Sequence, residues 1–334
     1  MLQSAKRIVL ASRPYGVPTK ENFREETLEL AGLAEGEVLV ESLYVSVDPY
    51  MRGRMNDTKS YVPPYAIDDA IAGGVIARVI ESRAQTLSAG DIVLAGYGWQ
   101  SHAIVKATHV QKIEQGNVPL SAFLGAVGMT GLTAYFGLLS LGKPKAGETV
   151  VVSGAAGAVG SIVGQIANIV GARVVGVAGS DAKCQWLREI GFDEAVNYKH
   201  ANFREQLALA TPNGVDVYFD NVGGDVSDAV LRRINHGARI PVCGQIATYN
   251  ETAPVYQTPI QGLLLINSAT MTGFIVSDFR DQFAKGIAEL SSWVESGQIQ
   301  YEETIVQGFE NTVEAFLMLF QGGNTGKLLV KVKE

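Results

Sequence analysis

Cysteine is scarce in this sequence. Only two of its 334 residues are cysteines, Cys184 and Cys243, and they lie far apart with no CxxC pair. Such a chain has no disulfide framework, and its cysteine usage is typical of a reducing compartment. We therefore expect a cytoplasmic protein.

Long apolar runs and blocks of one charge are also missing. No stretch approaches the roughly 18 uninterrupted apolar residues of a membrane-spanning helix. The segment MLQSAKRIVLASRPYG contains only a short apolar run before Arg13, which is too short for a signal peptide. The net charge is −7 without a basic block, so neither nucleic acid nor an anionic membrane is expected as a partner.

The sequence divides into two parts with different patterns of apolar and turn residues. Residues 1–122 hold short β-like runs, among them RIVLAS, EVLVESLYVSV and GGVIARVIES. Turn residues such as Pro63-Pro64 and Gly73-Gly74 separate these runs. This pattern predicts a compact all-β unit with a barrel-like fold.

From about Phe123 onward, strands alternate with helices. The runs ETVVVSG, RVVGVAG, EAVNY, VDVYFDNVG and ARIPVCG are typical of buried strands, and segments with helical spacing, such as DVSDAVLRRINHG, lie between them. Strands separated by helices of about 10 to 13 residues predict an α/β fold, a doubly wound parallel sheet with helices on both faces. The last run, GKLLVKV, is a strand that could rejoin the N-terminal β unit, which the sequence alone does not prove.

The segment TVVVSGAAGAVGSIVGQIA joins a hydrophobic strand to an apolar helix. Its spacing, Ala155-x-Gly157-x-x-Gly160, is a dinucleotide-binding fingerprint with alanine in the first glycine position. Small residues permit a tight turn and let the backbone approach a pyrophosphate, while the helix N-terminus offers N–H groups. A plain structural turn is the alternative, but the strand before and the helix after favour cofactor binding.

The residues after the next strand indicate which dinucleotide is bound. NAD-binding chains place an acidic residue about 20 residues after the turn, where it binds the adenosine ribose 2′-hydroxyl. Here Gly179 and Ser180 hold that place, and Lys183 supplies a compact cation suited to a 2′-phosphate. Asp181 complicates this interpretation unless its side chain turns away. The sequence thus favours NADP(H), the alternative being that Lys183 is an ordinary solvated helix residue.

Eight segments, in order along the chain, resemble one family. They are SVDPYMRGRM, GMTGLTAYFGLL, AAGAVGSIVGQIA, VVGVAGSDAK, VYFDNVGG, RIPVCGQIATYN, GFIV and GNTGKLLVKV. Nearly the whole chain resembles the zinc-independent medium-chain dehydrogenases/reductases, in the branch of leukotriene B4 12-hydroxydehydrogenase/prostaglandin reductase, plant alkenal double-bond reductases and bacterial curcumin reductase. The resemblance implies a GroES-like β-barrel substrate domain, residues 1–122 and 297–334, and a Rossmann NADP-binding domain, residues 123–296.

The resemblance also implies a reaction and an assembly. The reaction is NADPH-dependent, metal-independent reduction of the carbon–carbon double bond of an α,β-unsaturated ketone or aldehyde, by hydride transfer to the β-carbon. The assembly is a homodimer formed through edge strands of the Rossmann sheet, for which ATMTGFIV is a suitable segment. Zinc-dependent relatives need a cysteine-rich lobe and a Cys/His set, whereas VSVDPYM has no cysteine where they carry a ligand. We therefore expect no metal site.

The resemblance further assigns site residues. Tyr249 is implied beside the nicotinamide ribose, where its hydroxyl either donates to the developing enolate or only positions the cofactor. Tyr50 and Tyr61 are implied to line the substrate mouth, although each is equally well a packed or surface loop residue. The implied cofactor-binding residues are Gly157, Ala158, Val159, Gly160, Lys183, Tyr198, Asn221, Cys243, Gly244, Gln245, Ile246, Ala247, Thr248, Tyr249, Phe274, Ile275, Val276 and Asn324.

Some alternatives stay open from the sequence. Arg52 and Arg54 are expected to be structural ion-pair partners, and Asn324, in the turn GGNTGK, is a residue type that tolerates left-handed backbone. For the function as a whole, the alternatives to an enone reductase are an NADPH:quinone oxidoreductase of the same fold and a non-enzymatic NADP-binding interaction protein. The sequence does not name a physiological substrate.

Overall fold

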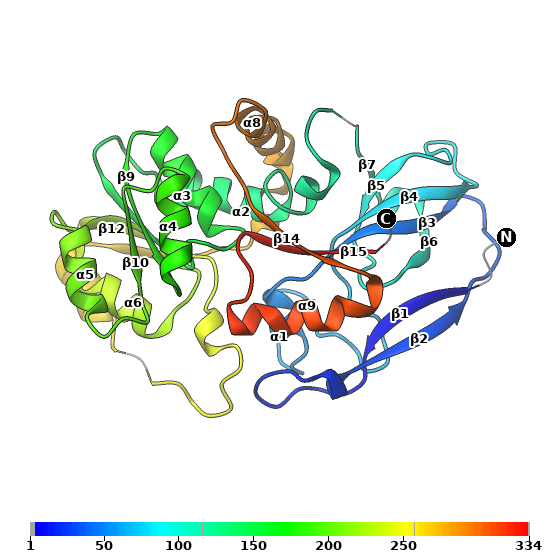
Figure 1. Cartoon of the computed structure of the whole chain (residues 1–334), viewed down its shortest axis with the longest axis horizontal. Helices are drawn as coiled ribbons and strands as arrows, with labels where there is room; N and C mark the ends of the chain where they lie inside the picture. The colour runs from blue at the N-terminus through cyan, green and yellow to red at the C-terminus, as the bar shows by residue number, and fades with distance from the viewer. Residues whose placement is uncertain (1–3, 115, 257, 333–334) are drawn as a thin grey trace.

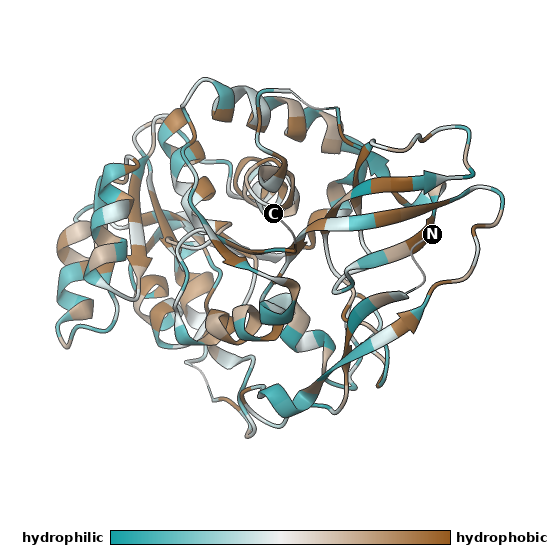
Figure 2. Ribbon diagram, turned by 45° about the vertical axis from the view of Figure 1, so that its right-hand side comes forward, coloured by the Kyte–Doolittle hydropathy of each residue, from teal (hydrophilic) through white to brown (hydrophobic). Residues whose placement is uncertain are grey.

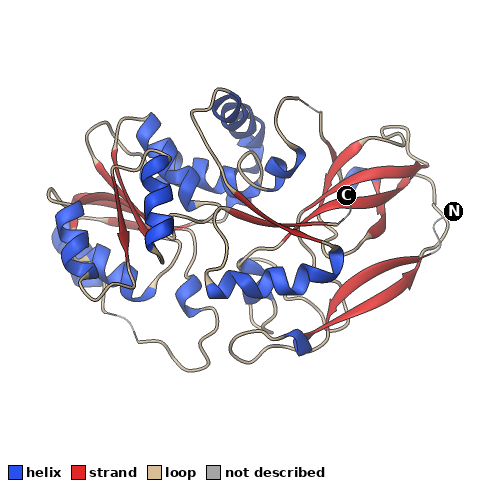
Figure 3. Ribbon diagram, in the orientation of Figure 1, coloured by secondary structure: helices blue, strands red, loops and turns tan. Residues whose placement is uncertain are grey.

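The chain folds into two units that lie side by side (Figure 1). The structure, a computed structural model, describes residues 4–114, 116–256 and 258–332. One unit is rich in β-strands drawn from both ends of the chain, and the other is a parallel sheet flanked by helices (Figure 3). None of the helices in the described ranges combines the length and the apolar character that crossing a membrane requires.

A seven-stranded sheet and a two-stranded hairpin form the β-rich unit. The sheet has the order β14-β15-β3-β4-β5-β7, with β6 paired to β3, and β1 pairs with β2. Trp99 is fully buried at the centre, where its ring packs against Phe23 and Phe316. The strands are β1 Ser4–Leu10, β2 Phe23–Glu29, β3 Glu37–Ser46, β4 Val75–Ser82, β5 Ile92–Ala95, β6 His102–Lys106, β7 Gln111–Lys112, β14 Glu303–Gln307 and β15 Lys327–Lys331.

Short helices complete this unit. Most of them lie in the connections between strands. They are η1 Lys20–Asn22, α1 Tyr50–Arg54, η2 Ala107–His109, η3 Leu120–Leu124, η7 Phe309–Asn311, α9 Thr312–Met318 and η8 Leu319–Gln321. Of these, α1 was not expected from the sequence, because its polar segment reads as a loop.

The C-terminal strand pairs with an N-terminal one. Strand β15 runs antiparallel to β3, with Leu329 opposite Ser46 and Val330 opposite Val45, and β14 runs parallel to β15. Val330 and Val45 are buried in the same hydrophobic cluster. The last strand therefore does return to the N-terminal sheet, while the domain boundaries at residues 122 and 297 stay a prediction.

The second unit is a six-stranded parallel sheet in the order β10-β9-β8-β11-β12-β13. Its strands are β8 Thr149–Ser153, β9 Arg173–Ala178, β10 Glu194–Asn197, β11 Val215–Phe219, β12 Ile234–Val242 and β13 Thr270–Gly273. The helical segments around it are α2 Met129–Phe136, η4 Gly137–Gly142, α3 Gly160–Ile169, α4 Asp181–Glu189, α5 Phe203–Ala210, α6 Gly224–Leu231, η5 Ile246–Thr248, α7 Gln261–Asn267, η6 Val276–Gln282 and α8 Phe283–Glu295. This is the doubly wound arrangement that the alternating sequence predicts.

Strand β8 shows why both faces of this sheet are covered. Its three valines are fully buried, and successive side chains point to opposite faces. Val150 and Val152 pack in one hydrophobic cluster with helix α3, and Val151 packs in another with α5 and α6. Brown strand segments are accordingly visible within the parallel sheet in Figure 2, whereas the helices around it show both colours. Strands buried on both faces are typical of parallel sheets.

One predicted helix ends earlier than expected. The segment DVSDAVLRRINHG was predicted as a helix, but α6 ends at Leu231 and β12 already begins at Ile234. Gly237, with a φ of 75°, accompanies a break in the pairing of β12 with β11, where Val215 and Val217 face Ile234 and Arg239. The irregular start of this strand hides its β pattern in the sequence.

Candidate functional site

The predicted cofactor residues lie along one edge of the parallel sheet. Because its strands are parallel, their carboxyl ends meet at the same edge. The glycine turn 157–160 follows β8, Lys183 lies on the helix after β9, Tyr198 follows β10, Asn221 follows β11, residues 243–249 follow β12, and residues 274–276 follow β13. The order of connection reverses between β8 and β11, and ligands of such sheets bind outside the carboxyl ends at this switch point.

The glycine turn brings helix α3 against strand β8 at very short range. A Cβ at Gly160 would lie 2.4 Å from the carbonyl oxygen of Gly154 and 2.8 Å from the Cα of Ala155, so only glycine fits there. Gly154 has a φ of 58°, which other residues rarely adopt. The turn therefore presents backbone rather than side chains at the start of α3, which suits a dinucleotide pyrophosphate.

Asp220, which the sequence did not single out, organises the loop at the switch point. Its buried carboxylate accepts five hydrogen bonds, from the hydroxyls of Ser153, Tyr218 and Ser227 and from the N–H groups of Val222 and Gly223. Next to it, Asn221 donates its N–H to Ser153 Oγ at 2.9 Å and its Nδ2 to Ser153 O at 2.8 Å. These bonds cross-link the ends of β8 and β11. In the sequence, the signal for this role is one acidic residue, Asp220, directly after the apolar run VYF.

The residues predicted for the 2′-phosphate flank the end of β9. The Ser180 hydroxyl caps helix α4 by accepting a bond from the Lys183 N–H at 3.3 Å. The Lys183 ammonium is half-buried and donates to the carbonyl oxygen of Gly322 at 2.9 Å. On the other side, the ring of Tyr198 lies against Gly179, where a Cβ would be 3.1 Å away from it. The structure thus brings Lys183 and Tyr198 to the same strand end.

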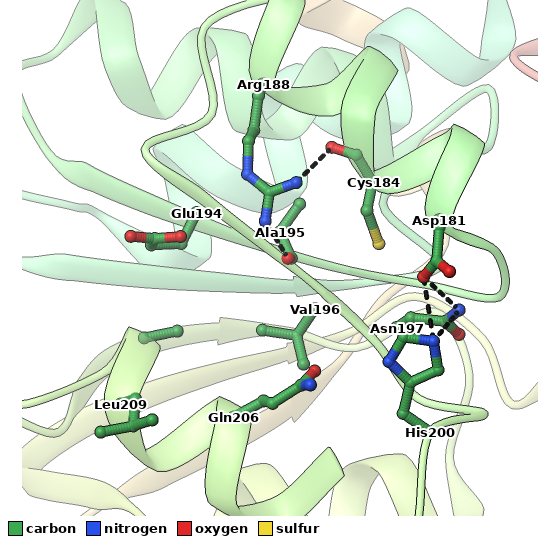
Figure 4. A pocket seen from close by; sticks show the side chains of 11 residues that line it. Asp181, Cys184, Arg188, Glu194, Ala195, Val196, Asn197, His200, Gln206 and Leu209 are labelled. Atoms are coloured by element: carbon green, nitrogen blue, oxygen red, sulfur yellow. Dashed lines mark hydrogen bonds and ion pairs between the residues drawn. The ribbon is translucent and has the colours of Figure 1, made fainter. Parts of the chain in front are cut away.

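Asp181 turns its carboxylate toward the connection after β10. Its Oδ1 accepts a hydrogen bond from Asn197 Nδ2 at 2.8 Å and lies 3.0 Å from His200 Nε2 (Figure 4). The Asn197 bond, followed by the charge of His200, lowers the pKa of Asp181. These three residues line a cavity of about 440 Å³ that contains none of the predicted cofactor or substrate residues. In the described part of the chain, the partners of Asp181 are therefore Asn197 and His200, and Lys183 is not among them.

Three tyrosines, two from the β-rich unit and one from the other, were predicted for substrate and catalysis. Tyr50 lies on α1, Tyr61 on the loop that follows it, and Tyr249 directly after η5. Burial raises the pKa of all three, and their charges act on one another, Tyr61 on Tyr50 and on Tyr249. Their phenols consequently stay protonated at neutral pH and can donate hydrogen bonds. Among the three residues predicted for substrate and catalysis, Tyr61 is thus the one that acts on both of the others.

Cys243 lies at the base of the segment that carries Tyr249. Its N–H donates to the carbonyl oxygen of Asp220 at 2.8 Å. Burial, with the charge of Asp220 as a second cause, raises the pKa of the Cys243 thiol to about 12. The thiol is therefore protonated at neutral pH, which makes it a poor nucleophile.

The predicted residues after β13 use their polar and aromatic groups within the protein. The ring of Phe274 packs edge-on against Phe219, with centroids 6.2 Å apart. The N–H of Ile275 donates to Asp278 Oδ2 at 3.1 Å. Phe274, Ile275 and Val276 are all partly exposed, so their surfaces and remaining backbone groups are open to a cofactor.

The turn that carries Asn324 lies against the glycine turn. The N–H of Gly326 donates to the carbonyl oxygen of Ala156 at 2.8 Å, and Asn324 Nδ2 donates to Gly326 O at 3.0 Å. The left-handed positions of this turn are taken by Gly322 and Gly326, with φ of 69° and 64°, and Asn324 is not among the described residues with positive φ. The interpretation of Asn324 as a left-handed turn residue is wrong, and the residue instead closes the turn beside the cofactor edge.

Arg52 and Arg54 do not form the expected ion pairs among the described residues. The guanidinium of Arg54 lies over the ring of Tyr65, 4.1 Å from its centroid, and donates to Pro63 O at 3.2 Å. Arg52 is buried, and its partners are neutral oxygens, one of them from Asn250 in the other unit. The sequence showed two arginines in a polar stretch but not which backbone would fold around them.

Comparison with known proteins gives two family matches. Residues 6–113 match the family described as the N-terminal domain of oxidoreductase, and residues 158–292 match the family described as zinc-binding dehydrogenase. The residues present do not fit a zinc ion, despite that second description. Nowhere in residues 4–114, 116–256 and 258–332 do three or more His, Cys, Asp or Glu side chains gather to hold a metal.

Full-length relatives are closely similar. YfmJ of Bacillus subtilis (strain 168) is 55% identical over 100% of this chain and 99% of its own. The NADPH-dependent curcumin reductase of Escherichia coli (strain K12) is 44% identical over 99% and 97%, and prostaglandin reductase 1 of Bos taurus is 44% identical over 98% and 99%.

Solved structures show the same architecture. CurA from Vibrio vulnificus in complex with NADPH superposes with a TM-score of 0.93 at 44% identity, covering 98% of this chain and 99% of that one. Escherichia coli quinone oxidoreductase complexed with NADPH, at 22% identity and a TM-score of 0.79 over 98% and 99%, shares the fold alone. From the matches along its whole length, the chain belongs to the medium-chain dehydrogenases/reductases, in the branch of the prostaglandin and curcumin reductases.

Proposed function

We propose that this protein uses NADPH to reduce the carbon–carbon double bond of α,β-unsaturated ketones and aldehydes. The observation that carries the proposal is the position of Tyr249. It follows the β12 end of the dinucleotide edge, and the next residue, Asn250, accepts a hydrogen bond at 3.0 Å from Arg52 on α1, the helix that carries Tyr50. The full-length similarity to an NADPH-dependent curcumin reductase and to prostaglandin reductase 1 supports it.

The chain's own residues fit the cofactor. We assign the pyrophosphate to the glycine turn, the 2′-phosphate to Lys183 and Tyr198, and the nicotinamide half to Asn221, the segment 243–249 and Asn324. Bound NADPH supplies a hydride. Ser153, which is itself bonded to Asp220, accepts from Asn221, and the Asp220 carbonyl oxygen accepts from the Cys243 N–H, so hydrogen bonds within the protein hold both residues.

The chemistry left to the protein is to polarise the carbonyl and to provide a proton for the α-carbon. A hydrogen-bond donor must already point at the oxygen on which enolate charge develops. Tyr249 is the proposed donor, because burial holds its pKa above the usual range and keeps the phenol protonated. We propose that Tyr50 and Tyr61 form the wall of the substrate mouth.

The reaction itself is tested with NADPH that carries deuterium at C4 of the nicotinamide. With a conjugated enone, the label is expected on the β-carbon, the α-proton is expected from solvent, and the carbonyl is expected to remain intact. Label on the carbonyl carbon of an allylic alcohol would identify a carbonyl reductase instead. Quinone turnover with no saturated enone product would favour the quinone oxidoreductase, and NADPH binding without any turnover would favour the interaction protein.

We also predict that activity is independent of metal. Among the described residues, no group of three or more His, Cys, Asp or Glu side chains is placed to hold zinc. Overnight treatment with a chelator is expected to leave the rate unchanged, with elemental analysis showing no stoichiometric metal. Stoichiometric zinc whose removal abolishes activity would contradict this prediction.

We propose a homodimer formed through the β13 end of the Rossmann sheet. Helix α7 beside this edge exposes Leu265 and Ile266, 80% and 72% accessible, which is costly unless a partner covers them. Light scattering is expected to give the mass of two chains for the parent and of one chain for Ile266→Asp. Leu209→Asp, which removes an equally exposed leucine from α5 near the opposite sheet edge, is the control and should stay dimeric. A monomeric parent at micromolar concentration would contradict the proposal.

The cellular location is also a proposal. Both cysteines are free thiols in the structure, Cys184 buried and Cys243 partly so. Together with an NADPH-dependent reduction, this favours a reducing compartment, and we propose the cytoplasm.

A further inference from the structure

Arg52 is a buried cation whose partners come from several distant segments. The residue is 3% exposed and lies on α1, two positions after Tyr50. Its Nε donates to Asn250 Oδ1 at 3.0 Å, and its Nη1 donates to Asn56 Oδ1 at 2.7 Å. Its Nη2 donates to the carbonyl oxygen of Gly16 at 2.9 Å. One guanidinium thus joins α1, the loop between β1 and β2, and the segment after β12.

The partners of this cation are neutral. Amide and carbonyl oxygens accept its hydrogen bonds, and no carboxylate within the described residues forms an ion pair with it. A guanidinium is a rigid planar fork, so several simultaneous hydrogen bonds fix its orientation and the positions of the acceptors. Losing one acceptor of a buried cation is costly, since the charged donor is left unpaired. Arg52 therefore holds its partners in a defined geometry.

The bond to Asn250 crosses between the two units. Asn250 directly follows Tyr249, on the segment after β12. The base of this segment is fixed to the Rossmann unit, where the Ala247 N–H donates to Val222 O at 3.0 Å. Its far end reaches the loop between β1 and β2 (Figure 1), where a Cβ at Gly16 would lie 3.5 Å from Thr252 Cγ2.

Two tyrosines of the site are therefore linked through their neighbours. Tyr50 is on the same short helix as Arg52, and Tyr249 is adjacent to Asn250. By contrast, the intrasegment contact of the Tyr249 hydroxyl, to the Gln245 N–H, is long at 3.5 Å and fixes the ring weakly. The bond from Arg52 to Asn250, the residue after Tyr249, is shorter at 3.0 Å, and its donor is charged.

We propose that Arg52 is a positioning residue which, through Asn250, holds Tyr249 opposite Tyr50 across the substrate mouth. The inference rests on the proposed enone reduction and specifies how the two units cooperate in it. The bond acts on the placement of the substrate carbonyl, and the adenosine end of the cofactor edge lies elsewhere, at Lys183 and Tyr198. Its loss should consequently lower turnover of the enone by a larger factor than NADPH affinity, to which the glycine turn, Lys183 and Tyr198 also contribute.

The test compares two asparagines that accept from the same arginine. Asn250→Ala removes the acceptor in the unit of the parallel sheet. Asn56→Ala removes the acceptor in the β-rich unit, to which Arg52 itself belongs. We expect Asn250→Ala to lower kcat/KM for the enone about tenfold or more, as loss of one hydrogen bond to a buried charge does, and Asn56→Ala to lower it about twofold at most. The Kd of NADPH, measured by fluorescence titration, should change by a smaller factor than kcat/KM in Asn250→Ala and by about twofold at most in Asn56→Ala. Equal losses in the two variants, or a parallel loss of NADPH affinity, would overturn the proposal.

A double-mutant cycle separates the link from a direct effect of Asn250. Arg52→Lys keeps the charge but loses the fork, so adding Asn250→Ala to it should change kcat/KM by less than about twofold. If the double variant instead shows the product of the two single losses in kcat/KM, Asn250 acts independently of Arg52, and the proposal is overturned. If Arg52→Lys does not fold, the comparison of Asn250→Ala with Asn56→Ala still decides.

A second measurement does not depend on turnover. Amide hydrogen exchange in residues 245–252 should be faster in Asn250→Ala than in the parent or in Asn56→Ala, at unchanged exchange in β8 and β9. A parent that reduces no enone would refute the proposed function, while the exchange comparison would still test the link. Unchanged exchange in Asn250→Ala would refute the link even in an active enone reductase.

Discussion

Lys183→Ala is expected to weaken NADPH binding about 10- to 150-fold and to leave NADH binding within about twofold. The range corresponds to about 1.5–3 kcal/mol, which is typical of a hydrogen bond between a charged donor and a phosphate. Lys183 is placed for this contact in the first turn of α4, after the Ser180 cap. Isothermal titration with each cofactor provides the measurement.

The nearby Lys199 makes a matched control. Its charge acts on Lys183 as the second cause, after burial, that lowers the pKa of Lys183. Both lysines are thus close enough to the same strand end to compete for a phosphate. Lys199→Ala is expected to cost less than Lys183→Ala. A larger loss in Lys199→Ala would move the phosphate contact to Lys199, and equal affinities of the parent for NADH and NADPH would remove the contact altogether.

Much of the fold could be predicted from the sequence because its elements carry strong local patterns. The strand of Val150, Val151 and Val152 is buried on both faces, so it appears as a continuous apolar run. The start of β12 was missed because Gly237 and the break in pairing interrupt the periodicity. The helix α1 was missed because five residues are too few to show helical spacing.

The site could be predicted only where a residue's role depends on its own segment. The glycine turn has a local signature, since Gly160 must fit against Gly154 a few residues earlier. Asp220 and Arg52 act through partners that are distant in sequence, Ser153 for the first and Asn250 for the second. Such pairs leave no pattern in a single sequence. The orientation of Asp181 was likewise undetermined until Asn197 and His200 were placed beside it.

Tyr249→Phe is expected to lower the rate of enone reduction roughly 10- to 1000-fold, the range for losing one positioned donor. The substitution keeps the ring and removes only the hydroxyl. In the parent, burial followed by lesser contributions from Cys243 and Tyr61 raises the pKa of Tyr249, against a lowering by the Gln245 N–H. A raised pKa means that the phenol keeps its proton through mildly alkaline pH, so the parent should not lose a proton donor there.

The affinity for NADPH decides how the hydroxyl acts. A fall in kcat at unchanged Kd means that the hydroxyl donates to the developing enolate, whereas an equal loss in Kd means that it aligns the cofactor. Tyr256→Phe removes a hydroxyl from a tyrosine that is 94% exposed on the same connection and serves as the control. If both variants keep the parental rate, Tyr249 has no part in the reaction. Polarisation of the carbonyl then falls to the ribose 2′-hydroxyl of the nicotinamide half or to Tyr50, whose burial also keeps its phenol protonated, and the proton to one of these or to solvent.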